Sequence, residues 1–338
     1  MAKKILSYKK KVTKKSTKKV AKKTNKKSTK KQFKKLRTIK QLELMADVIR
    51  EDIVAMLFHA KSGHSAGALG MADILTALYF NVLNHNPKKP KDKARDRFIL
   101  SNGHTCPVLY ATLANAGYFP KKELLTLRKL GSRLQGHPHR TSLPGVETSS
   151  GPLGSGLSQA AGMATVFKRE KTKQKVFVIA GDGEQNEGNH WEAVMYAAKE
   201  KLHNLIAITD RNYIQIDGNT ETIMPLDQLE DKYLAFNWNV VTIDGNDMEQ
   251  VLSALKASKS NSQKPLMIIA NTTPGKGVSF MEGDYHWHGK APKDNETQEA
   301  LRQIHQHECL ERGDWYKMHS LLQPVHLISG SKKRRSRK

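Results

Sequence analysis

The chain has 338 residues, of which 57 are Lys or Arg and 32 are Asp or Glu, and its net charge is +25. The whole excess lies in two tails, 1–40 and 331–338, so the segment between them is formally neutral, and it is long enough for one large α/β core. Two cysteines 203 positions apart, Cys106 and Cys309, exclude a disulfide scaffold and a cysteine-based zinc site and fit a reducing compartment, so we expect a cytoplasmic protein.

The N-terminal arm, 1–40, carries 19 basic residues and no acid, mostly as Lys pairs separated by small residues. It has too little apolar surface to fold alone, so we predict disorder, and it lacks the apolar core of a secretory signal. Together with the C-terminal tail, 331–338, it fits electrostatic binding to nucleic acid or to an acidic surface. A solubilising extension and a targeting peptide are the alternatives, and composition does not separate them.

Helices dominate the next part of the chain. Residues 41–60 carry apolar side chains at helical spacing, and a second helix is expected at 71–83. The apolar stretch 65–83 contains Asp73 and two Gly and does not match a membrane span, so no membrane partner is expected. The following predicted elements are a short buried strand at 98–100, helices at 107–116 and 121–130, a loop at 141–156 and a helix from about Leu157.

Four apolar segments then predict the strands of a parallel sheet: 175–183, which ends in Gly-Asp-Gly, 205–210, 238–244 and 265–273. Helical patterns lie between them at 187–200, 226–235 and 247–258. This alternation predicts an α/β fold, a doubly wound and mostly parallel sheet with helices on both faces. Ligands of such sheets bind at the carboxyl ends of the strands, where this sequence places Gly, Asp and Asn residues.

The first candidate site lies at two of these strand ends. Asp182 is in the Gly-Asp-Gly turn and Asn212 lies just past the next strand, with 28 residues between Gly183 and Asn212. Successive parallel strands are usually neighbours, so Asp182 and Asn212 should meet. A carboxylate, an amide oxygen and a carbonyl suit Mg²⁺ or Ca²⁺, and the glycines let backbone N–H groups approach a phosphate.

Four histidines lie in loops beside glycine: His64, His104, His137 and His288. A lone histidine is more often structural, but four in converging loops fit the polar surroundings of a sugar or phosphate, and histidine suits proton transfer near neutral pH. The Gly-rich segment 151–156 resembles a dinucleotide fingerprint only loosely, because it follows a loop and not a strand. Close backbone approach to a flat ligand is the better interpretation.

Together these motifs resemble the N-terminal half of a transketolase, an enzyme that uses thiamine diphosphate. Gly-Asp-Gly followed by Asn at this distance is the diphosphate motif of that cofactor. Five segments match transketolases in order: 62–79, 96–113, 143–164, 181–193 and 212–218. The match runs from about Leu44 to Pro292, and the resemblance implies a transketolase-like diphosphate-binding domain at 41–330.

The resemblance implies a role for each candidate residue. Asp182, Asn212 and the carbonyl of Ile214 would hold Mg²⁺ against the diphosphate, and the Gly183 N–H would bind a diphosphate oxygen. The other implied residues are Gly151, Pro152 and Leu153 along the aminopyrimidine, His104 and His288 beside the diphosphate and thiazolium, His64, His137 and His288 at the substrate hydroxyls, and Glu187 in a link between two active sites. The match departs at Ser65 and Ala66, where the family usually has Pro-Gly.

The resemblance also implies a partner. In transketolases a second domain supplies the glutamate that activates the aminopyrimidine and the arginines for the sugar phosphate, whereas only about forty residues separate Pro292 from the basic tail. The chain therefore resembles the N-terminal subunit of a split transketolase, whose cofactor lies at an interface with a C-terminal subunit in a heterotetramer. The implied reaction moves a two-carbon ketol unit from a ketose phosphate to an aldose phosphate.

Three other interpretations remain open. The α subunit of a 2-oxo-acid dehydrogenase also carries Gly-Asp-Gly and Asn, but the loops of His64 and His104 argue against it. Deoxyxylulose-phosphate synthase is a second relative, and the segment 143–154 is closer to transketolase. The third is a non-catalytic transketolase-like protein associated with nucleic acid, which the tails favour and the intact Asp182 and Asn212 oppose.

Overall fold

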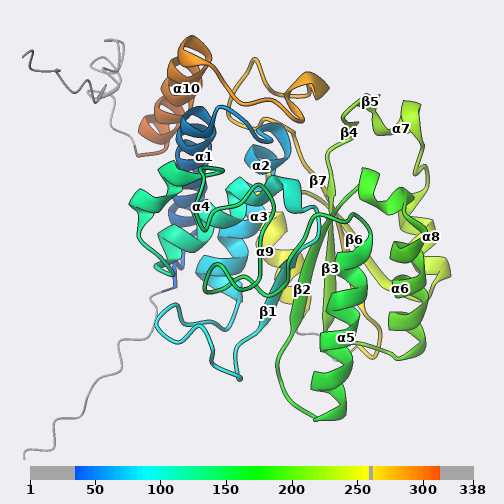
Figure 1. Ribbon diagram of the computed structural model, residues 1–338. Coiled ribbons are helices and arrows are strands. Elements are labelled where there is room, and N and C mark those ends of the chain that lie inside the picture. The colour runs from blue at the N-terminus through cyan, green and yellow to red at the C-terminus, as the bar shows by residue number, and fades with distance from the viewer. Residues whose placement is uncertain (1–34, 259–261, 313–338) are drawn as a thin grey trace, which may run out of the picture. The chain divides into compact units, whose positions relative to one another are not determined.

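A computed structural model describes residues 35–258 and 262–312 of the chain. Its main sheet has five parallel strands in the order β1-β2-β3-β7-β6 (Figure 1). The strands are β1 (Arg97–Leu100), β2 (Val176–Gly181), β3 (Leu205–Arg211), β6 (Asn239–Asp244) and β7 (Leu266–Asn271). The predicted doubly wound parallel α/β sheet is therefore confirmed, including the expected adjacency of β2 and β3.

Alternating side chains of each strand enter two separate hydrophobic cores, one on each face of the sheet. In β2, Phe177 and Ile179 pack into the first core, whereas Val176 and Val178 pack into the second. Strands β3 and β7 alternate in the same way. Because both faces are covered, these strands appear in the sequence as continuous apolar runs.

Helices cover both faces (Figure 1). The first core is covered by α1 (Ile39–Ala60), α2 (Ala66–Gly70), α3 (Ala72–Ala77), α4 (Cys106–Ala116), α9 (Met248–Ala257) and α10 (Asp294–Arg312). The second is covered by α5 (Ser155–Arg169), α6 (Gly188–Lys199) and α8 (Leu229–Ala235). Helix α3 continues into a π-helical turn, Leu78–Val82, which completes the predicted helix at 71–83.

The helix predicted at 121–130 is wrong. This segment forms a short 3₁₀ helix, Lys121–Thr126, and then a series of turns. Leu124 and Leu127 are the buried residues, and their i, i+3 spacing fits a 3₁₀ helix as well as an α-helix. Arg128 then adopts a left-handed backbone conformation with φ 57°, which ends any helix.

The sequence analysis did not predict helix α10 or the small hairpin of β4 (Ile214–Gln215) and β5 (Gly218–Asn219), which precedes α7 (Thr220–Ile223). Helix α10 packs against α1 through the buried Ala300 and Ile304. No helix in the described part of the chain is long and apolar enough to span a membrane.

Helix α1 begins inside the predicted arm. Thr38 forms a capping box with Gln41 at its N-terminus, and the Leu36 N–H donates to the carbonyl of Phe80 at 2.9 Å. The folded part therefore begins before residue 41. The rest of the Lys-rich arm and the tail at 331–338 lie outside the described residues, and the disorder predicted for them stays a prediction.

Candidate functional site

The candidate metal residues lie at the carboxyl ends of β2 and β3. Gly181 of β2 pairs with Asp210 of β3, so the turns after both strands lie side by side. The Asp182 carboxylate is buried and accepts hydrogen bonds from the backbone N–H groups of Gly183 and Tyr213, each at 2.7 Å. The turn that follows β3 is thus held directly by Asp182.

Asp210 orients the Asn212 amide. The Asn212 Nδ2 donates to the Asp210 Oδ2 at 2.8 Å, and the Thr272 hydroxyl donates to the Asp210 Oδ1 at 2.5 Å. With its amino group taken, Asn212 presents its oxygen, which accepts the Ile214 N–H at 3.0 Å. Burial, with a smaller contribution from Asp182, raises the pKa of Asp210 to about 7. The sequence analysis missed Asp210, although it precedes Asn212 by two residues.

These residues fit a hard cation. Asp182, the Asn212 oxygen and the Ile214 carbonyl would supply one carboxylate and two neutral oxygens, the ligand type that Mg²⁺ and Ca²⁺ prefer. Across the described residues there is no group of three or more His, Cys, Asp or Glu side chains placed to hold a metal, so no competing site is present there. Burial raises the pKa of Asp182, as expected for a carboxylate that lacks a full counter-charge.

Arg211 and Gly183 modify this picture. The Arg211 Nη1 lies 3.4 Å from the Asp182 Oδ2, while its Nη2 donates to Glu221 at 2.5 Å. This guanidinium places a positive charge beside the candidate metal residues, a feature that the sequence analysis did not single out. The Gly183 N–H already donates to Asp182, so binding a diphosphate oxygen would require it to exchange that partner.

Three of the four candidate histidines form one cluster. The ring centroids of His64, His104 and His288 lie 4.9 to 5.6 Å apart. Gly67 connects this cluster to the strand ends, because a Cβ added there would lie 3.0 Å from Thr105 and 3.8 Å from Asn212 Nδ2. The histidine loops and the metal residues therefore converge at one edge of the sheet.

Burial lowers the pKa of all four histidines, to about 4 for His64 and well below its usual value for His104. The neighbouring His288 and Arg128 lower the pKa of His64 further. These imidazoles are therefore neutral near pH 7. A neutral imidazole can accept a proton or exchange hydrogen bonds with a sugar hydroxyl, as the proposed substrate roles require.

The fourth histidine, His137, is held near the cluster by its loop. The Cys106 thiol donates to the carbonyl of Gly136 at 3.2 Å, and the Tyr110 hydroxyl donates to that of Gln135 at 2.9 Å. A Cβ added to Gly151 would lie 3.6 Å from the His137 ring, so the segment 151–153 passes beside it. Cys106 is 1% exposed and burial raises its pKa to about 12, which confirms that it is a packed thiol and not a nucleophile.

We expect the stability of the chain to fall as the pH is lowered from about 6.5 to about 4. In the unfolded chain the His64 imidazole takes up a proton at its ordinary pKa of 6.5, whereas in the folded chain it does so only at about 4, so acid favours unfolding across this window. His64→Gln should flatten the urea-unfolding free energy against pH, and the exposed His203→Gln should leave the slope unchanged. His190, whose pKa burial also lowers to about 4, accounts for part of the slope that remains.

Ser65 joins two histidine loops. It is 1% exposed, and its hydroxyl donates at 2.5 Å to the carbonyl of Lys290, 225 positions away. It therefore fixes the loop of His288 against the loop of His64. The proline that the resemblance leads one to expect at this position has no hydroxyl for this bond, so the departure from the family pattern has a structural counterpart.

We expect Ser65→Ala to destabilise the chain by about 1 kcal/mol, because the Lys290 carbonyl would lose a buried partner. In a working enzyme the same change should raise the KM of the sugar substrate severalfold by loosening His288 relative to His64. Steady-state kinetics and urea unfolding measure the two effects. Ser158→Ala, which removes a hydroxyl bonded at the surface to Asn189, is the matched control. An unchanged KM in Ser65→Ala would contradict the positioning role.

A buried glutamate that the sequence analysis missed ties three loops together. Glu184 is 3% exposed and accepts hydrogen bonds from the Ser101 hydroxyl and from the backbone N–H groups of Gly154 and Gly181. Gly154 ends the segment proposed to lie along the aminopyrimidine. Glu184 therefore positions that segment against β1 and β2. Its place directly after Gly-Asp-Gly was the only sequence signal for it.

The remaining candidates lie at the outer side of this edge. Glu187, Pro152 and Leu153 are exposed, and the Leu153 side chain is 42% exposed. Within the described residues, four buried polar atoms of the loops around them have no hydrogen-bond partner: His64 Nδ1, Asn102 Oδ1, Ser150 Oγ and Gln215 Nε2. Exposed apolar surface beside unpaired polar atoms fits a face that a ligand or another chain covers.

Comparisons with known proteins bear on this geometry. Residues 41–310 match the family described as transketolase, thiamine diphosphate binding domain. One of the two kinds of chain named for the apulose-4-phosphate transketolase of Phocaeicola vulgatus is 41% identical over 266 residues, which cover 79% of this chain and 94% of that protein. The 6-deoxy-6-sulfo-D-fructose transketolase subunit SqwG of a Clostridium species is 43% identical, over 72% of this chain and 88% of that one.

Longer proteins match over part of their length. The crystal structure of transketolase from Campylobacter jejuni superposes with a TM-score of 0.75 at 33% identity, covering 80% of this chain and 43% of that chain. Human transketolase is 34% identical over 80% of this chain and 43% of its own length. The chain thus spans less than half of these transketolases.

Proposed function

The chain belongs to the transketolase family and carries its thiamine diphosphate binding domain, and on this basis we propose that it is the N-terminal subunit of a two-chain transketolase. One observation carries the proposal: the chain covers 94% of a relative named as one subunit of a transketolase but only 43% of the longer transketolases. The folded part would extend over 41–330, as expected from the sequence. The partner would be a C-terminal subunit, in a heterotetramer with two copies of each.

In this proposal the chain binds and orients the cofactor. Asp182, Asn212 and the Ile214 carbonyl would hold Mg²⁺, and the segment 151–153, fixed by Glu184, would lie along the aminopyrimidine. When bound, thiamine diphosphate would stabilise the charge that develops as the carbon–carbon bond of the ketose breaks. The chemistry on the carbon skeleton would thus belong to the cofactor, and this chain would fix its position.

The histidines would act on the substrate. His64, His137 and His288 would exchange hydrogen bonds and protons with sugar hydroxyls, and His104 would lie beside the diphosphate. Their lowered pKa values keep them able to accept protons at neutral pH. Exposed Glu187 would face the second active site of the assembly. Because two relatives are named for sugars that carry a phosphate or a sulfo group, we propose an anionic ketose as the donor.

Ketol transfer by the two-chain complex tests this function. The chain, purified with a C-terminal transketolase subunit, should transfer a two-carbon unit from a ketose phosphate to an aldose phosphate when thiamine diphosphate and Mg²⁺ are present. Chelation of divalent metal should abolish turnover, and Mg²⁺ or Ca²⁺ should restore it. A stable complex that binds cofactor but transfers nothing from any ketose phosphate would favour the non-catalytic alternative.

The basic tails motivate a second, separable activity. We propose that the Lys-rich arm and the tail at 331–338 bind nucleic acid or an acidic surface by releasing counterions. Removing 1–34 and 331–338 should abolish DNA or RNA binding in a salt titration and leave ketol transfer intact, since the deletion spares the capping box of Thr38. Loss of turnover with an intact fold would show instead that the arm belongs to the active site.

A further inference from the structure

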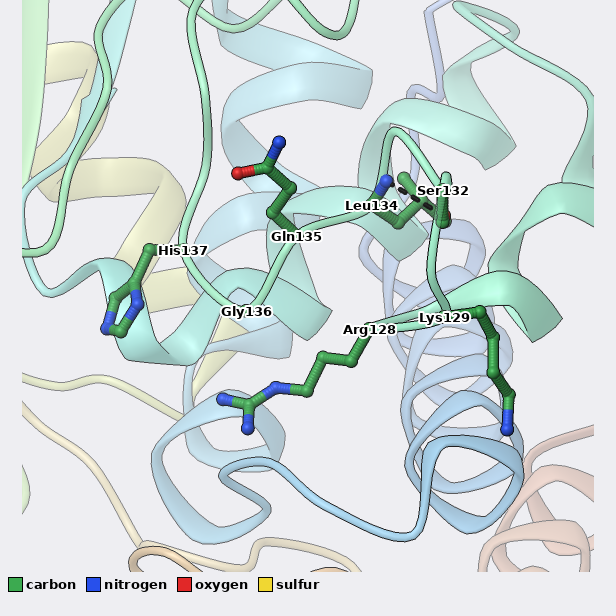
Figure 2. Close-up of a pocket in the computed structure, with 7 residues that line it drawn as sticks. All are labelled: Arg128, Lys129, Ser132, Leu134, Gln135, Gly136 and His137. Atoms are coloured by element: carbon green, nitrogen blue, oxygen red, sulfur yellow. Dashed lines mark hydrogen bonds between the residues drawn. The ribbon is translucent and has the colours of Figure 1, made fainter.

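A basic pocket of about 410 Å³ lies beside the histidine cluster, in the turns that follow the 3₁₀ helix (Figure 2). Its lining runs from Arg128 to His137. Figure 2 shows the Arg128 side chain passing below Gly136 on the side of His137, whereas the Lys129 side chain extends the opposite way. No part of this pocket has a role in the function proposed above except His137.

Two glycines make room for the Arg128 guanidinium. A Cβ added to Gly136 would lie 2.9 Å from its Nε and 3.0 Å from its Cζ, so the guanidinium rests against the Gly136 backbone. A Cβ added to Gly63 would lie 3.8 Å from the same Nε. Arg128 thus lies between the loop that carries His137 and the loop that carries His64. Its backbone, at φ 57°, is held by a hydrogen bond from its N–H to the Leu134 carbonyl at 2.8 Å.

This guanidinium lacks an acceptor. Within the described residues the Arg128 side chain makes no hydrogen bond and no ion pair, although the residue is half-buried. The other cations of this segment are engaged: the Lys129 Nζ donates to the carbonyl of His59 at 2.6 Å, and Arg133 pairs with Glu123 at 2.7 Å. An arginine presents five N–H donors in a planar fork that matches a phosphate or carboxylate, so an unpaired one held between two glycines fits an anion.

We propose that Arg128 binds the anionic group, phosphate or sulfonate, of a sugar substrate whose hydroxyls face His64 and His137. The proposal rests on the proposed function for the identity of the substrate, and it assigns part of the recognition of its charge to this subunit. The implied arginines of the partner would then contact the same group from the other side. Specificity for charged over uncharged ketoses would be shared across the interface between the two chains.

Anion binding by the chain itself is the first test, with inorganic phosphate and inorganic sulfate as probes. At constant ionic strength, both should raise the unfolding temperature of the wild-type chain and of Lys129→Gln, relative to chloride, and should have no effect on Arg128→Gln. Gly136→Ala separates position from charge, because the added methyl group displaces the flexible end of Arg128 while its charge stays. Gly136→Ala should weaken the phosphate response, whereas a nonspecific charge effect would leave it unchanged.

Kinetics of the two-chain complex is the second test. Arg128→Gln should raise the KM of a phosphorylated or sulfonated ketose about tenfold or more, and leave that of an uncharged ketose within about twofold, since charge-assisted hydrogen bonds are lost only for the anion. Arg128→Lys should recover part of the loss. Equal effects on charged and uncharged donors, or a wild-type phosphate response in Arg128→Gln, would overturn the proposal. So would weakened association of the two chains with normal phosphate binding, which would assign Arg128 to an acidic side chain of the partner.

The two tests also separate this proposal from the function on which it rests. If the wild-type complex transfers no ketol unit, the proposed function fails, and the phosphate titration on the chain still decides whether Arg128 forms an anion site. If the complex is active and Arg128→Gln discriminates between charged and uncharged donors as the wild type does, the function stands and the anion site is rejected.

Discussion

The chain alone is expected to show no ketol transfer, and turnover should appear only when a C-terminal transketolase subunit is added. In the described residues the pocket edge has one wall: Pro152 and Leu153 are exposed, and nothing covers them there. The resemblance implies that a glutamate from elsewhere must hydrogen-bond the aminopyrimidine. Glu184 cannot serve, because its carboxylate is occupied by Ser101, Gly154 and Gly181.

A coupled assay with each chain alone and with both together measures this effect. Activity should be undetectable for either chain and should rise with the concentration of the complex, which size-exclusion chromatography with light scattering quantifies. Glu187→Gln, at an exposed position beside Gly154, should reduce turnover without preventing assembly, which separates contact from chemistry. Full turnover by the purified 338-residue chain would contradict the two-chain proposal.

The sheet was predictable from sequence because its strands are buried on both faces. The run at 175–183 contains β2, Val176–Gly181, and the run at 238–244 contains β6, Asn239–Asp244. Side chains that point to either core must be apolar, so such strands appear without alternation. Once β2 and β3 are neighbours, Asp182 and Asn212 follow at the same edge, which is why the central pair could be located from spacing alone.

Contacts between distant loops were not predictable. The hydrogen bond of Ser65 to Lys290 spans 225 positions, and that of Ser101 to Glu184 spans 83. No local pattern encodes which loops meet, since the encounter depends on strand order and on glycines that allow close approach. Gly156 is one example: a Cβ there would lie 2.2 Å from the Ser101 Oγ. Arg128 was missed for a related reason, because the segment 121–130 was assigned to a helix, where its side chain would have faced elsewhere.

Asp182→Asn is expected to abolish binding of thiamine diphosphate and Mg²⁺ while the fold survives. Asparagine keeps the size of the side chain and one oxygen, which can still accept the N–H of Tyr213, now at 2.7 Å from the carboxylate. It removes the charge that a hard cation needs. Loss of an outer-shell partner typically costs roughly 10- to 100-fold in metal affinity, so loss of a ligand should cost at least about 100-fold.

The stability of this variant sets apart a binding defect from misfolding. Burial raises the pKa of Asp182, so the folded chain without metal holds this carboxylate at an energetic cost that asparagine removes. Against that gain, the N–H of Gly183 loses its acceptor, a loss of about 1 kcal/mol. The two effects oppose each other, and the unfolding temperature should shift by only a few degrees, roughly as expected for 1 kcal/mol in a domain of this size. Calorimetric titration with the partner present measures binding, with Asp231→Ala on the exposed side of α8 as the control. Unchanged cofactor affinity in Asp182→Asn would remove Asp182 from the metal site, whereas lost affinity in a chain that unfolds at its normal temperature would leave loss of the ligand charge as the cause.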